Sequence, residues 1–176
     1  MIVKDKNFEL YIDRATIANR IDELARQISS DYAGKDLLAL IVLKGGMFFG
    51  VELLTKLSIP CDIETIRLSS YGSQMTSSGV VKTIMGLQGE VANRNVLIIE
   101  DIVDTGKTIK TLHELLTEKG VASIAVAALT LKHEVYNGTI PLPYIGFRIP
   151  NKFVIGFGLD YDQHGRTLPD IYQLAE

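Results

Sequence analysis

The chain has 176 residues, 47% of them hydrophobic, so it is long enough to bury roughly 70% of its unfolded surface in one compact domain. Its 18 Lys and Arg against 21 Asp and Glu give a net charge of −3, and without basic runs this argues against nucleic acid as a main partner. The N-terminus lacks an apolar signal core, and the longest wholly apolar run, 37–43, is too short to cross a bilayer. These features predict a soluble, cytoplasmic protein.

The first third of the chain alternates between strand and helix patterns. Residues 8–12 predict a short strand, and Asp13 is a candidate cap for an amphipathic helix that follows. Residues 37–43 predict the first buried strand, which ends at Lys44-Gly45-Gly46 before a second helix. A cation and two permissive backbone positions at a strand end can hold an anion, although a Gly-Gly pair is often only a turn.

A polar, Gly- and Ser-rich stretch at 69–79 lies between two strand-like segments, 61–68 and 80–85. It has too little apolar surface to pack, so it predicts a mobile loop. The loop is either a plain hairpin tip or a lid over a site.

The stretch 96–109 carries the clearest functional signal. Four apolar residues predict a buried strand of a parallel sheet, and Glu100 and Asp101 follow where that strand is expected to end. Residues 104–108 then form a turn into a helix, for which Gly120 is the predicted stop.

The residue types in this stretch suggest a ribose phosphate. Backbone N–H groups at the helix start suit a phosphate, whereas two adjacent carboxylates suit ligand hydroxyls or a hard cation such as Mg²⁺. One alternative is a solvated acidic turn in which Thr105 is an ordinary helix N-cap. A Walker A loop is excluded, because its first glycine would fall on Asp101.

The last third of the chain adds two more strand patterns, 122–131 and 144–147, the first of which ends in Lys132. A lysine at a strand end is a functional candidate, although such lysines are more often only solvated. Residues 153–162 contain Gly-x-Gly, but the third glycine of a dinucleotide fingerprint would fall on Tyr161, so a Rossmann site is rejected.

The stretch 96–109 resembles the phosphoribosyl-pyrophosphate (PRPP) motif of type I phosphoribosyltransferases, and its Asp-Thr-Gly-Lys-Thr is similar to the hypoxanthine-guanine branch. The resemblance implies an α/β fold whose central, mainly parallel sheet is flanked by helices. It also implies a hood over the base site, built from roughly 1–12 and 144–176, and a lid at 69–79. The implied reaction is Mg²⁺-dependent transfer of the 5-phosphoribosyl group from PRPP to N9 of hypoxanthine or guanine, in purine salvage by a homodimer or homotetramer.

The resemblance also assigns roles to individual residues. The phosphoribosyl and 5′-phosphate set is Glu100, Asp101, Asp104, Thr105, Gly106, Lys107 and Thr108, with Asp104 as general base. The purine set is Lys132, Phe153, Val154 and Asp160, and the pyrophosphate set is Lys44, Gly45, Gly46 and Arg166. Ser70 and Tyr71 match the lid pair, and Glu100, Asp101 and Asp160 match metal-binding acids. Family members often have an unusual peptide geometry at the Lys-Gly-Gly stretch.

The chain departs from the family pattern in one segment. Gln163-His164-Gly165 stands where relatives often carry aromatic residues, and Asn151 stands where an acid is common, so the role of Arg166 depends on the structure. Two rival functions remain: an enzyme with a xanthine or broader 6-oxopurine preference, and a PRPP-sensing regulator without catalysis. The regulator is disfavoured because Asp104, Lys132 and Phe153 are present and the chain is slightly acidic.

Overall fold

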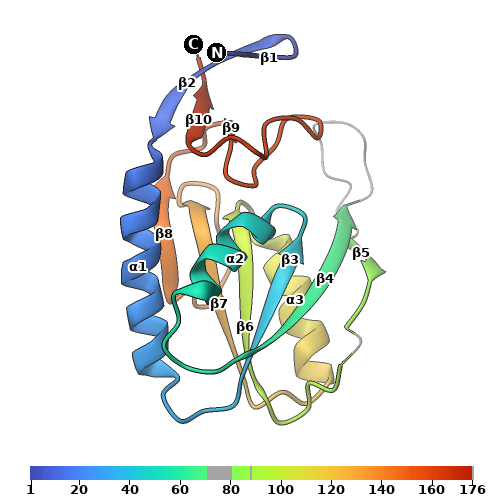
Figure 1. The fold of residues 1–176 in the computed structure, drawn as a ribbon. Helices are drawn as coiled ribbons and strands as arrows, with labels where there is room; N and C mark the ends of the chain where they lie inside the picture. Colours follow the sequence, from blue (N-terminus) through green and yellow to red (C-terminus); the bar gives the residue numbers. More distant parts are fainter. Residues whose placement is uncertain (71–80, 88, 176) are drawn as a thin grey trace.

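The computed structural model describes residues 1–70, 81–87 and 89–175, and its main layer is a six-stranded sheet (Figure 1). The strand order is β5-β4-β3-β6-β7-β8. These strands are β3 (Leu37–Leu43), β4 (Asp62–Ser70), β5 (Val81–Met85), β6 (Asn95–Val103), β7 (Ser123–Lys132) and β8 (Tyr144–Ile149). Neighbouring strands are parallel, except that β5 runs antiparallel to β4. The predicted central, mainly parallel sheet is confirmed.

Helices cover both faces of this sheet because its inner strands are apolar on both sides. Leu37, Ala39 and Ile41 pack in one core with α1 (Arg14–Asp31) and α2 (Gly46–Thr55). Their neighbours on β3 point the other way, into a second core with α3 (Lys107–Glu118). Asp13 caps α1 as predicted, because its Oδ1 accepts a hydrogen bond from the Thr16 N–H at 2.8 Å.

A second, four-stranded sheet joins the two ends of the chain. It has the order β1-β2-β10-β9, with β1 (Ile2–Val3), β2 (Lys6–Ile12), β9 (Val154–Ile155) and β10 (Ile171–Leu174). Figure 1 shows it beyond the edge of the main sheet to which the arrowheads of β3 and β4 point. The predicted hood boundary at residue 144 is wrong, because β8 forms a parallel ladder with β7 in the main sheet.

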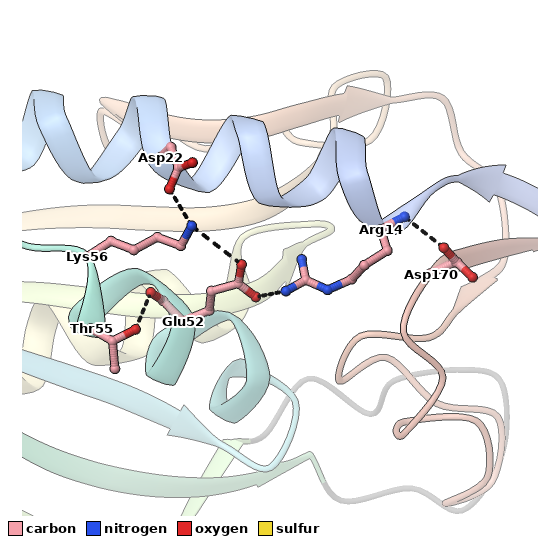
Figure 2. Close-up of polar contacts among 6 residues, drawn as sticks. All are labelled: Arg14, Asp22, Glu52, Thr55, Lys56 and Asp170. Carbon is pink, nitrogen blue, oxygen red and sulfur yellow. Dashed lines mark hydrogen bonds and ion pairs between the residues drawn. The ribbon is translucent and has the colours of Figure 1, made fainter.

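Polar contacts connect α1, α2 and the C-terminal segment (Figure 2). The Arg14 guanidinium pairs with Glu52 of α2 at 2.6 Å, and the Arg14 backbone N–H donates to Asp170 Oδ1 at 2.7 Å. Lys56, just after α2, pairs with Asp22 of α1. These contacts fix the orientation of α2, which begins at the predicted pyrophosphate loop.

The predicted lid lies mostly outside the described residues. Ser70 is the last residue of β4, and Tyr71 belongs to the part of the chain that the structure does not describe. Among the residues that it does describe, none of the helices is both long and apolar enough to span a membrane.

Candidate active site

A cavity of about 420 Å³ lies at the carboxyl ends of β3 and β6, the edge where parallel α/β sheets place their ligands. Its lining includes Glu100 and Asp101, the whole turn 104–108, Gly45, Asp160 and Arg166. The structure therefore brings the predicted phosphoribosyl set together with part of the pyrophosphate set. The other lining residues are Val42, Leu43, Leu68, Ile102, Val103 and Ile109.

The turn at 104–108 leads into α3 without an ordinary N-cap. Gly106 is the cap residue, at a left-handed φ of 83°, and no side-chain hydrogen bond caps the helix start. The alternative in which Thr105 caps the helix is therefore wrong. A helix N-terminus that no side chain caps is suited to an anion, because its first N–H groups point toward the ligand and the helix dipole favours negative charge.

Strand β6 does not end at the two acids, as the sequence pattern suggested. It continues to Val103, because its ladder with β7 persists to the Val103 and Leu131 pair. Glu100 and Asp101 are consequently buried, with exposed fractions of 7% and 9%. Burial raises the pKa of both carboxyls, and the neighbouring Asp101 charge raises the pKa of Glu100 further.

This pair of acids fits a divalent cation that is held jointly with a substrate. Two buried carboxylates beside one cavity repel each other, and a cation would favour their ionised forms. Within residues 1–70, 81–87 and 89–175, no group of three His, Cys, Asp or Glu side chains forms a metal site on its own. Mg²⁺ commonly binds through one or two carboxylates plus substrate phosphates, so this donor set is sufficient.

The loop at Gly45 packs closely against Asp101, so a side chain at Gly45 would require a shift. A Cβ built at Gly45 would lie 1.7 Å from Asp101 Oδ2, and one built at Gly158 would lie 2.2 Å from the Gly45 carbonyl oxygen. The Leu43–Lys44 peptide bond is cis. The Lys44 side chain is not among the lining residues of the cavity, and its Nζ donates to Gln163 Oε1 at 3.2 Å.

Arg166 lines the cavity in spite of the departure in the preceding segment. Its Nη2 lies 2.6 Å from Asp160 Oδ1, and its Nη1 donates to the Gly158 carbonyl at 2.6 Å. Asp160 Oδ2 also accepts from the Gln163 N–H at 2.7 Å. Gly158 had no predicted role; a Gly-x-Gly pattern such as 156–158 is the sequence signal that can indicate a close backbone approach.

The predicted purine set is only partly assembled. Lys132 Nζ lies 3.1 Å from Asp104 Oδ2, and the exposed side-chain fractions of the two residues are 12% and 47%. Phe153 is 41% exposed and Val154 is buried, and neither is among the residues that line this cavity in the described chain. The Phe153 ring packs edge-on against Tyr161, with ring centroids 5.7 Å apart.

Comparisons with known proteins identify the family of this chain. Residues 11–162 match the family model described as phosphoribosyl transferase domain. The chain is 40% identical over 170 residues to a hypoxanthine-guanine phosphoribosyltransferase of Mycobacterium tuberculosis, covering 89% of this chain and 84% of the relative. A hypoxanthine-guanine phosphoribosyltransferase of Dictyostelium discoideum is 39% identical over 172 residues, and the match covers 96% of this chain and 96% of the relative. A solved hypoxanthine phosphoribosyltransferase of Staphylococcus aureus superposes with a TM-score of 0.89 at 36% identity, covering 95% of this chain and 91% of that one.

Proposed function

The chain belongs to the phosphoribosyltransferase family, in its hypoxanthine-guanine branch, and on that premise we propose that it transfers the 5-phosphoribosyl group of PRPP to N9 of hypoxanthine or guanine. The products are IMP or GMP and pyrophosphate, and the role is purine salvage in the cytoplasm. The observation that carries the proposal is one cavity lined by an uncapped helix start, two buried acids and Asp104, which pairs with Lys132.

Different residues of this cavity bind different parts of PRPP. The turn 105–108 holds the 5′-phosphate at the start of α3, and Glu100 and Asp101 accept hydrogen bonds from the ribose hydroxyls or would hold a metal ion. Gly45 and Arg166 bind the pyrophosphate through a backbone amide and a guanidinium. Glu100 and Asp101 would hold Mg²⁺, and Asp160 would help to hold a second ion; bound there, the metal would neutralise charge on the leaving pyrophosphate.

Asp104 acts as the general base. Its carboxylate lines the cavity and takes a proton from the purine ring as the glycosidic bond forms. Lys132 Nζ, 3.1 Å from that carboxylate, donates a hydrogen bond to O6 of the base. A 6-oxopurine accepts this bond, whereas adenine presents an amino donor at the same position.

The direct test is turnover with PRPP and Mg²⁺ against hypoxanthine, guanine, xanthine, adenine, uracil and orotate, with pyrophosphate and nucleotide measured separately. We expect turnover with 6-oxopurines only, and the relative rates rank the preference at the 2-position. PRPP binding without turnover on any base would instead favour the regulator. We also propose a homodimer or homotetramer from the family, which light scattering resolves.

Replacing Lys132 with Ala is expected to raise KM for hypoxanthine roughly 10- to 100-fold, because a hydrogen bond from a charged group contributes about 1.5–3 kcal/mol. The dissociation constant of PRPP should remain within about twofold, since the phosphate and pyrophosphate sites are unchanged. Steady-state kinetics and calorimetric titration measure the two quantities. Lys119→Ala, at the exposed C-cap of α3, is the matched control. Equal losses for purine and PRPP would contradict the O6 contact.

A further inference from the structure

We propose that Tyr136 is a positioning residue that holds the 5′-phosphate loop in its binding conformation. The inference rests on the proposed function, because it takes residues 105–108 as the phosphate site. Tyr136 belongs to the segment that follows β7 and had no predicted role.

Three residues of the phosphate loop line two different cavities. Thr105, Gly106 and Lys107 line the active-site cavity, and the same three residues line a second cavity of about 520 Å³. Tyr136 lines only the second cavity. Residues that line the second cavity can therefore pack against the loop and help to set its position.

The Tyr136 ring supplies this packing directly against the helix start. A Cβ built at Gly106 would lie 2.6 Å from Tyr136 Cε2 and 3.0 Å from Cδ2, so the ring edge touches the Gly106 backbone. Gly106 is the N-cap of α3 and has a φ of 83°. Glycine reaches this conformation without strain but also has the greatest backbone freedom, which a fixed neighbour restricts.

Hydrogen bonds hold Tyr136 both at its side-chain hydroxyl and at its backbone. The Tyr136 hydroxyl donates to the Ile140 carbonyl at 2.7 Å, and the Tyr136 backbone N–H donates to the Lys132 carbonyl at 3.0 Å. Burial raises the pKa of the phenol further above neutral pH, where its ordinary value already keeps it a neutral donor. A Cβ on Gly138 would lie 2.7 Å from the ring, so the backbone closes over it there as well.

Tyr136 also connects the proposed purine contact at Lys132 with the phosphate loop at Gly106. The turn that carries Tyr136 begins at Lys132, whose Nζ pairs with Asp104, while the ring of Tyr136 touches Gly106 two residues further on. Phosphate capture by backbone N–H groups depends on their preset directions, and a misplacement of about 1 Å can cost roughly 100-fold. Loss of the ring should therefore weaken PRPP binding more than the chemical step.

The test compares Tyr136→Ala with the conservative Tyr136→Phe, which keeps the ring and loses only the hydroxyl. For Tyr136→Ala we expect KM and the dissociation constant for PRPP to rise about tenfold, with kcat and KM for hypoxanthine within about threefold. Tyr136→Phe should stay within about twofold of the original protein. Calorimetry with PRPP and Mg²⁺, steady-state kinetics and thermal melting are measured on the same preparations.

Unchanged PRPP binding in Tyr136→Ala, or an equal loss in Tyr136→Phe, would overturn the inference. If Tyr136→Ala does not fold, Tyr136→Leu keeps apolar volume without the flat ring and should show the same selective loss. A Tyr136→Leu protein that binds PRPP with the affinity of the original protein would then reject the positioning role of the ring. An unmodified protein that neither binds PRPP nor turns over any base overturns the proposed function as well, whereas a normal enzyme with an insensitive Tyr136 overturns this inference alone.

Discussion

Asp104→Asn is expected to lower kcat by roughly 10²- to 10⁴-fold, the range by which a positioned general base accelerates a reaction. Asparagine has nearly the same shape, and its amide oxygen can still accept from Lys132, which lies 3.1 Å from the carboxylate. It cannot take a proton from the purine ring. The PRPP dissociation constant should therefore change by less than about threefold, because the substitution leaves the proposed phosphate and pyrophosphate contacts intact.

Steady-state kinetics and calorimetry on the Asp104→Asn protein separate these two effects. Asp22→Asn is the matched control, since Asp22 lies on α1, pairs with Lys56 and is absent from the cavity lining (Figure 2). It should keep the original kcat. Full turnover in Asp104→Asn would remove Asp104 from the role of base, and a parallel loss of PRPP affinity would assign it to binding instead.

Gly45→Ala is expected to lower kcat/KM for PRPP by about 100-fold or more. The backbone at Gly45 is helical, with φ −60° and ψ −48°, so alanine meets no conformational penalty there. The damage is steric, because the new Cβ would lie 1.7 Å from Asp101 Oδ2 and 2.3 Å from its Cγ. Asp101 is buried in β6, so either the proposed pyrophosphate loop must shift or the Asp101 carboxylate must turn away from the position proposed for the ribose.

The measurements are kcat/KM for PRPP and the melting temperature. Gly34→Asn is the control: Gly34 has a φ of 72°, which asparagine tolerates, and a Cβ there meets no atom within 4 Å. The control should behave as the original protein does. A Gly45→Ala enzyme with normal efficiency would show that the loop does not need its close approach to Asp101.

Prediction from the sequence was most accurate where the signal is local. The run 37–43 is apolar along its whole length, and β3 has those bounds. Asp13 and Gly120 mark helix ends as predicted, since capping depends on the few residues beside the cap. The type of chemistry was also readable, because two acids followed by a Gly-containing turn form a continuous stretch at 100–108.

Prediction failed where a partner strand decides the structure. Nothing in residues 100–103 shows that β7 continues alongside them, so the end of β6 was placed too early. The same cause moved 144–149 out of the predicted hood, since only its ladder with β7 assigns this segment to the main sheet. Threonine is a common N-cap residue, which made Thr105 a candidate, but the N-cap of α3 is Gly106 in a left-handed conformation.

The sequence by itself determined the order of the main-sheet strands and the three helices, but not β1, β9 and β10 of the second sheet. It also determined the family motif at 96–109 and the chemical groups available for PRPP and a purine. Only the tertiary structure decided which of these groups meet: Gly45 with Asp101, Lys132 with Asp104, and Tyr136 with Gly106. The physical reason is the distance along the sequence between the residues that interact. Helix periodicity, caps and turns depend on residues a few positions apart, whereas these contacts depend on the strand register and loop paths that bring distant segments to one edge of the sheet.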